Sequence, residues 1–178
     1  ADSIARLLEV AYRIHLIPNT EEGYMNEWES ILQASGIKQG YLNKYKEIDK
    51  YKIEYFLLFD ESNGSCIKSC IINARANLKM VRTAVTLEVW NTVNSWYHEL
   101  EKFEEKKYHS RDLPEILDWV KKNVNLIKGT IDNTQLINDG FDFIRLGLYF
   151  ERADFTARII DVKYFILLPS SSYIGSQV

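Results

Sequence analysis

Cysteine is nearly absent from this chain of 178 residues, which contains only Cys66 and Cys70. The two lie four residues apart, so on a helix they share a face, but the stiff backbone would strain a bridge between them. No histidine lies near them in the sequence to complete a metal site. We therefore expect two buried, reduced thiols rather than a disulfide or a pair of metal ligands.

Long apolar runs are missing as well. No stretch approaches the roughly 18 consecutive apolar residues of a membrane-spanning helix, and the first residues do not form a secretory signal. The net charge is −3, so the chain lacks the basic excess that binds nucleic acid or anionic membranes. The sequence therefore predicts a soluble, cytoplasmic protein whose partners include neither nucleic acid nor a membrane.

The common catalytic motifs are also absent from the sequence. The chain has no glycine-rich phosphate loop and no nucleophile elbow. The Glu-x-x-His pairs of di-iron helical bundles do not occur, so a ferritin-like metal centre has no support. We expect no metal and no cofactor.

Helical periodicity is what the sequence does contain. Glycine and proline number 8 and 3, and between them apolar residues recur at spacings of three and four. Residues 53–59 have the composition of a buried strand, but the chain offers no second strand candidate to pair with them. The sequence therefore predicts an all-α fold, an antiparallel bundle of about six or seven helices in a single domain spanning residues 1–178.

The aromatic and aliphatic residues of 41–60 keep a helical period, which predicts one helix over that range. Capping residues indicate where two further helices begin. Ser65 or Ser62 is expected to cap the next helix. Asp112, with Glu115 three residues later, resembles a capping box and is expected to start another helix.

The last long helical stretch, residues 141–168, shares a motif with the start of the chain. Residues 1–12 align with residues 153–164 over the frame Ala-Asp-x-x-Ala-Arg, two aliphatic residues, an acid, then Val-x-Tyr. The predicted fold therefore carries a repeated helix motif at the two ends of the chain. Because the first copy begins inside a helical pattern, we expect the chain to be truncated at both ends and part of a longer one.

Polar residues form two narrow stripes on this last helix. At 100° per residue, the first stripe covers about 20° to 100° of the helical wheel and contains Glu151, Asp154, Arg158 and Asp161. The second covers about 200° to 240° and contains Arg152, Thr156 and Lys163. A surface helix normally has one polar face. We therefore expect this helix to be largely surrounded by protein.

The first stripe can form a charged triad, because Arg158 can reach both Asp154 and Asp161 on its own helix. The start of the chain repeats this triad as Asp2, Arg6 and Glu9. Three interpretations remain open: exposed ion pairs of little energetic value, a buried network in which the two triads interlock, or a ligand or catalytic site. Further charged residues on the central helices could join such a network: Arg75, Arg82 and Glu88.

Several stretches resemble the bacterial alpha-E domain family. The most specific is LGLYFERADFTARIIDVKYFILLP, residues 146–169, and FLLFDESN at residues 56–63 resembles the middle of that family. ADSIARLLEVAYR at the start resembles its opening helix, and residues 102–139 match loosely. The family's central motif usually reads Ala-Arg-Glu-Asn-Ala-Arg, whereas Ala76 and Lys79 stand here in place of its Glu and its second Arg.

The resemblance implies an all-helical protein whose family has no established activity. Genes of the family lie beside, or are fused to, genes for an ATP-grasp peptide-ligase-like protein and transglutaminase-like proteins, which implies a role in making or modifying a peptide. Two hypotheses follow. The first is a non-catalytic helical partner or scaffold for such a system. The second is an enzyme or ligand-binding bundle that uses the charged residues of the last helix as a cleft.

Overall fold

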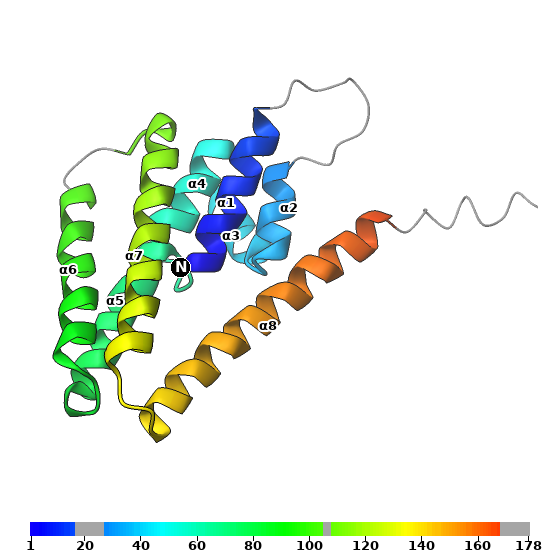
Figure 1. The fold of residues 1–178 in the computed structure, drawn as a ribbon. Helices are drawn as coiled ribbons and strands as arrows, with labels where there is room; N and C mark the ends of the chain where they lie inside the picture. Colours follow the sequence, from blue (N-terminus) through cyan, green and yellow to red (C-terminus); the bar gives the residue numbers. More distant parts are fainter. Residues whose placement is uncertain (17–26, 105–107, 168–178) are drawn as a thin grey trace, which may run out of the picture.

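The computed structural model describes residues 1–16, 27–104 and 108–167. Over these residues it contains eight α-helices, two short 3-10 helices and no strand, which confirms the all-α prediction (Figure 1). The α-helices are α1 (Asp2–His15), α2 (Glu27–Ala34), α3 (Lys38–Tyr45), α4 (Lys50–Leu58), α5 (Ile67–Met80), α6 (Leu87–Glu104), α7 (Leu113–Thr134) and α8 (Asp139–Leu167).

Six helices surround one hydrophobic core. Helix α5 packs against α6, α6 against α7, α7 against α1, and α1 against α2. Helix α4 contacts both α2 and α5 and so completes the ring, while α3 packs on α2 and α4. The helices bury apolar residues at helical spacing, and in α1 these are Ile4, Ala5, Leu8 and Ala11.

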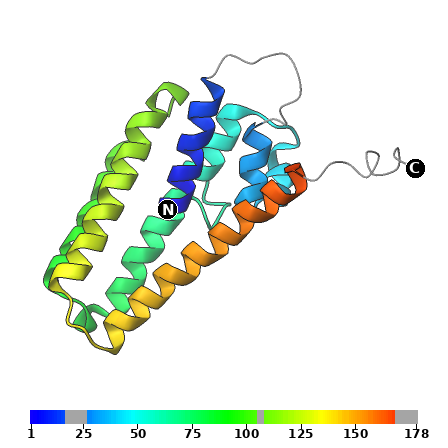
Figure 2. The same ribbon diagram turned by 45° about the vertical axis from the view of Figure 1, so that its right-hand side comes forward.

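Helix α8 lies outside this ring and crosses it diagonally, in contact mainly with α2 (Figures 1 and 2). None of its described residues belongs to the buried core. Phe155 and Val162 are half-buried, whereas Phe143, Phe150 and Ile160 are 73%, 67% and 62% exposed. The prediction that this helix is largely surrounded by protein was therefore wrong, because protein covers only one of its two apolar flanks.

The structure has more helices than the predicted six or seven, partly because residues 41–60 form two helices rather than one. Lys46 follows α3 with a left-handed backbone, at φ 62°. Asp49 then caps α4, since its carboxylate accepts a hydrogen bond from the Lys52 backbone N–H at 2.8 Å. The tyrosine period continues across the break and therefore concealed it.

The caps of α5 and α7 also differ from the predicted ones. Cys66, rather than a serine, caps α5: its Sγ accepts a hydrogen bond from the Ser69 backbone N–H at 3.3 Å. Burial raises the pKa of this thiol, and both cysteines are free, with Cys66 buried and Cys70 half-buried. Asp112 occupies the predicted N-cap position of α7, but its side chain makes no capping hydrogen bond there. Its carboxylate accepts instead from the His109 backbone N–H at 3.2 Å, at the start of the 3-10 helix Ser110–Asp112.

Gly36 ends α2 in a Schellman motif, where a residue with positive φ is needed. Its φ is +72°, its N–H donates to the Gln33 carbonyl, and the Ile37 N–H donates to the Leu32 carbonyl. A Cβ atom on Gly36 would lie 2.3 Å from Nη1 of Arg158, so α8 passes directly over this turn.

We expect Gly36→Ala to lower the free energy of unfolding by about 1–2 kcal/mol, because alanine resists a positive φ. Chemical denaturation monitored by circular dichroism measures this. Gly40→Ala is the matched control, since Gly40 lies in α3 with open space around its Cα. Alanine there should leave stability unchanged or raise it by up to about 1 kcal/mol. Equal effects of the two substitutions would contradict this assignment of Gly36.

Candidate functional site

The charged residues of α1 bind lysines of α7. Asp2 binds Arg6 on its own helix, at 2.9 Å from Oδ1 to Nε, and binds Lys128 through Oδ2. Glu9 binds Lys121 at 3.0 Å, and its other oxygen binds Arg13 at 2.6 Å. The predicted bridging of Asp2 and Glu9 by Arg6 is therefore replaced by two pairs between helices.

The lysines also change the acidity of these carboxyl groups. Burial raises the pKa of Asp2, but Lys128 and Arg6 outweigh that effect, so the pKa falls below its usual value. The hydrogen bond from Lys121 is the main cause of the lowered pKa of Glu9. Both carboxylates therefore favour the charged, paired state that holds α1 on α7.

The matching residues of α8 are exposed. Asp154 and Arg158 pair at 2.9 Å with side chains 61% and 46% exposed. Glu151 accepts a 2.5 Å hydrogen bond from Ser3 of α1, and Arg152 and Asp161 are exposed. The acids of α1 pair with lysines of α7, and Asp154 pairs within α8, so the two triads do not interlock.

The three candidates on the central helices lie apart from these charges. The guanidinium of Arg75 stacks 4.3 Å above the Tyr97 ring, and its Nε donates to Asn94 at 2.8 Å. Arg82 lies 5.2 Å from the Trp90 ring. Both arginines therefore join the α5 region to α6, while Glu88 lines a pocket.

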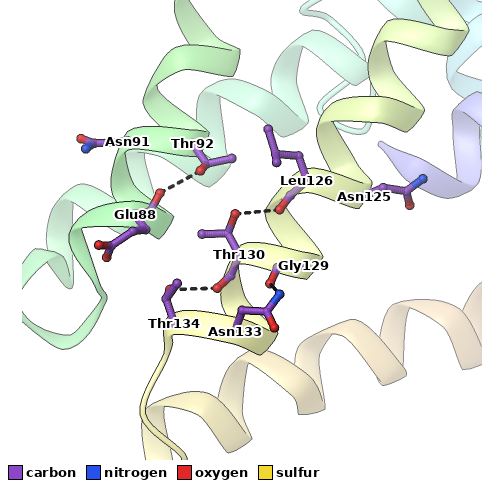
Figure 3. A pocket seen from close by; sticks show the side chains of 9 residues that line it. All are labelled: Glu88, Asn91, Thr92, Asn125, Leu126, Gly129, Thr130, Asn133 and Thr134. Atoms are coloured by element: carbon purple, nitrogen blue, oxygen red, sulfur yellow. Dashed lines mark hydrogen bonds between the residues drawn. The ribbon is translucent and has the colours of Figure 1, made fainter.

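That pocket, about 590 Å³ in volume, lies between α6 and α7 (Figure 3). It is lined by Glu88, Asn91, Thr92, Asn125, Leu126, Gly129, Thr130, Asn133 and Thr134. Several of its polar groups are already used: Thr92, Thr130 and Asn133 donate to backbone carbonyls of their own helices. Glu88 is the one charged residue in this lining. None of the α8 candidates lines it.

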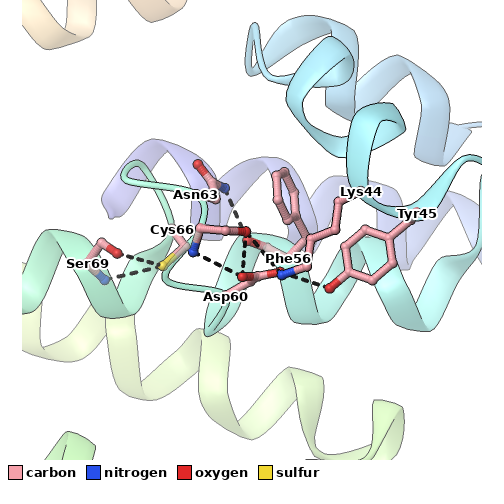
Figure 4. Close-up of polar contacts among 8 residues, drawn as sticks. Lys44, Tyr45, Phe56, Asp60, Asn63, Cys66 and Ser69 are labelled. Carbon is pink, nitrogen blue, oxygen red and sulfur yellow. Dashed lines mark hydrogen bonds and ion pairs between the residues drawn. The ribbon is translucent and has the colours of Figure 1, made fainter.

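Asp60 organises a polar cluster at the end of α4 (Figure 4). Its carboxylate, 6% exposed, accepts hydrogen bonds from Lys44 at 2.6 Å, Tyr45 at 2.8 Å and the Ser62 hydroxyl at 2.7 Å. Burial raises the pKa of Asp60, but these donors outweigh burial and lower it to about 2. Asn63 donates to the Phe56 carbonyl at 3.1 Å, which fixes the same loop.

Glu54 is a fully buried residue of α4. Oε2 accepts hydrogen bonds from the Tyr108 hydroxyl at 2.7 Å and from Ser110 at 2.6 Å, while Oε1 has no hydrogen-bond partner among the residues that the structure describes. Burial, then the hydrogen bond to Glu54, raises the pKa of Tyr108 well above its usual range. The phenol therefore stays a donor and secures the segment before α7 to α4.

Sequence reasoning missed both Asp60 and Glu54. For Asp60 a local signal existed, because the loop DESNG carries the residues that form Asx turns. For Glu54 none existed, because its partners lie 54 and 56 residues away.

In the described part of the chain, no three His, Cys, Asp or Glu side chains gather in a way that could hold a metal ion. No helix in that part of the chain combines the length and apolarity needed to cross a membrane.

A family model described as a predicted alpha-helical domain with a conserved ER motif, Alpha-E, matches residues 1–177. The chain belongs to the Alpha-E family. The sequence of this Alpha-E domain contains a single Glu-Arg dipeptide, Glu151-Arg152, on α8. No curated protein and no solved structure matches the chain.

The most unusual surface of this Alpha-E domain is the outer face of α8. We define it by six residues at alternating spacings of three and four: Phe143, Leu146, Phe150, Ala153, Ala157 and Ile160. All six are exposed. Contiguous exposed apolar residues on a soluble domain mark interaction surfaces. The outer face therefore joins the charged stripe beside it as the candidate site.

We expect Arg158→Ala to change the melting temperature by less than about 2 °C, because both members of its ion pair are exposed. Lys44→Ala is the contrast: it should lower the melting temperature by several degrees, since it leaves the buried Asp60 carboxylate without its cation. Thermal unfolding measures both. A large loss for Arg158→Ala would instead indicate a buried network.

Asp60 should make the free energy of unfolding fall as the pH is lowered. Its folded pKa of about 2 lies below the ordinary 3.8, so its contribution is complete above about pH 4 and is lost as pH falls toward 2. The contribution is on the order of 2 kcal/mol. Urea unfolding of wild type and Asp60→Asn between pH 5 and 2 checks this. The variant should lose less stability over that range, and parallel curves would contradict the role of Asp60.

Proposed function

We propose that this protein is a non-catalytic helical partner or scaffold in a cytoplasmic peptide-synthesis or peptide-modification system. The outer face of α8 is the observation that carries this proposal. It exposes Phe143, Phe150 and Ile160 by 73%, 67% and 62%. Leaving such side chains in water costs roughly 1.5–3 kcal/mol each relative to full burial. A partner that covers this face would therefore gain affinity from it.

The partner class in this proposal comes from the family resemblance. Alpha-E genes accompany genes for ATP-grasp peptide-ligase-like and transglutaminase-like proteins, which makes the ATP-grasp protein the first partner to test. A scaffold role also agrees with the side-chain chemistry. The titratable groups with shifted pKa values, such as Asp2, Glu9 and Asp60, are used in structural pairs.

The alternative function, an enzyme or ligand-binding bundle with a charged cleft, has less support. Its proposed residues Glu151, Arg152, Asp154, Arg158 and Asp161 lie exposed on α8 and outside the pocket between α6 and α7. Glu88 is the one candidate that lines that pocket. A single carboxylate among amides and hydroxyls can bind a polar ligand, but it lacks the second group that acid–base catalysis needs.

We expect the protein to co-purify with an ATP-grasp protein of the kind that the family resemblance implies, and Phe150→Asp to abolish the complex. Phe150 is 67% exposed, so this substitution should leave the fold intact. Met80→Asp is the matched control, because Met80 is 84% exposed and belongs to α5 rather than to the outer face of α8. Pull-down and size-exclusion chromatography measure the complex. Absence of any complex at micromolar concentrations of both proteins would refute the proposed partner.

A further inference from the structure

The sequence repeat places the same helix in two different environments. Adding 152 to a residue number of α1 gives its counterpart in α8, so Ala5 corresponds to Ala157 and Leu8 to Ile160. Ala5 and Leu8 are completely buried. Ala157 and Ile160 are exposed, the latter by 62%. Part of the apolar surface that α1 buries is therefore uncovered on α8, while Thr156 and Lys163 stand at the positions of the buried Ile4 and Ala11.

The charges beside this surface follow the same comparison. In α1, Asp2 and Glu9 lie seven residues apart and bind Lys128 and Lys121, which are also seven residues apart on α7. The higher-numbered acid binds the lower-numbered lysine, so α1 and α7 are antiparallel. The carboxylates are 18% and 24% exposed in these pairs. A seven-residue repeat of apolar and charged positions is the pattern by which two helices pack in register.

Helix α8 has acids at the same two positions as α1, but no lysine of another helix pairs with Asp154 in the described part of the chain. Asp154 corresponds to Asp2 and Asp161 to Glu9. In both copies the Asp gives one carboxylate oxygen to the Arg four residues later, as the pairs with Arg6 and Arg158 show. In α1 the second oxygen of Asp2 binds Lys128, whereas the part of the chain that the structure describes provides no such lysine to Asp154.

The apolar stripe extends beyond the repeated segment. The outer face of α8 runs from Phe143 to Ile160 at spacings of 3, 4, 3, 4 and 3, which is the seam of a coiled coil. At 1.5 Å per residue the seam is about 25 Å long. The opposite flank, with Phe155, already faces the domain, so the seam is directed away from it.

We propose that the outer face of α8 binds an amphipathic helix of a partner protein, antiparallel to α8, that carries two lysines or arginines seven residues apart beside an apolar stripe. The chemistry is that of α7, where Leu117, Val120 and Val124 are buried next to Lys121 and Lys128. The basic side chains pair with Asp154 and Asp161. This inference rests on the scaffold function proposed above and identifies its binding surface. It is tested without the ATP-grasp protein.

A second copy of this chain is a poorer occupant than a basic helix. Two α8 helices packed antiparallel along this seam would bring Asp154 of one copy toward Asp161 of the other, because both acids flank the seam on the same side. Like charges placed together oppose association. A helix with basic residues at these positions converts the same two carboxylates into attractive contacts.

A synthetic peptide of α7, residues Leu113–Thr134, is the probe for this surface. We expect the labelled peptide to bind the whole protein with one-to-one stoichiometry in fluorescence anisotropy. The double variant D154K/D161K should weaken binding by about tenfold or more, because it replaces attraction by repulsion. A peptide carrying K121E/K128E should bind that variant better than it binds wild type. The control E61K/E101K, which reverses two exposed acids elsewhere, should change nothing.

The bound position and the fold need separate readouts. A photo-crosslinker at Val124 of the peptide, midway between the two lysines, should label α8 near Ala157. Circular dichroism should show D154K/D161K folded, and Ile160→Asp should weaken the peptide as well by removing part of the apolar stripe. If D154K/D161K lost binding because it unfolded, the charge-reversed peptide K121E/K128E would not bind it either.

Several results would overturn the proposal. They are no binding of the peptide to wild type, binding that D154K/D161K leaves unchanged, crosslinks to α1 instead of α8, or a dimer of the protein joined through α8. Peptide binding without any complex with the ATP-grasp protein would support this surface while refuting the proposed function.

Discussion

The placement of α1 between α7 and α2 is the contact on which the rest of the fold depends. Two completely buried residues of α1, Ala5 and Leu8, belong to the hydrophobic core. Asp2 and Glu9 pair with Lys128 and Lys121, and these two pairs set the register of α1 on α7. Helix α2 reaches the ring of helices through α1 and α4, and α8 reaches it mainly through α2, so the position of α8 depends on the packing of α1. A half-buried ion pair adds little energy by itself, but a pair in register with an apolar seam selects one alignment.

The two copies of the repeated motif show how the surroundings decide what a sequence does. Both copies form helices, and both join the Asp to the Arg four residues later. In α1 protein covers the flank with Ala5 and Leu8, and the lysines of α7 complete its charges, whereas Val10 and Ile14 on the other flank are 53% and 45% exposed. In α8 only the flank that includes Phe155 is covered. The same acids are therefore structural in one copy and available for recognition in the other.

Much of the fold could be predicted from the sequence, because helical structure depends on local periodicity. The last helix, its pairing of Asp154 with Arg158 and its two apolar flanks all followed from spacing alone. The identity of the covered flank did not, since an exposed apolar flank and a buried one have the same composition. The pairs of Asp2 and Glu9 join residues more than 100 positions apart, and the environment of Glu54 is equally non-local. The break at Lys46 was hidden because the tyrosine period continues through it.

The attachment of α8 has a dynamic consequence. Its described polar links to the ring are few: Ser3 to Glu151, and Arg145 to Asp132 at 2.9 Å. Little apolar area holds it, since its described side chains are at most half-buried. Opening of such an element requires far less free energy than unfolding of the core, so the chain consists of two cooperative units of unequal stability. Backbone amides in α8 then exchange with solvent through local detachment, while those in α1 and α7 exchange only when the ring itself opens.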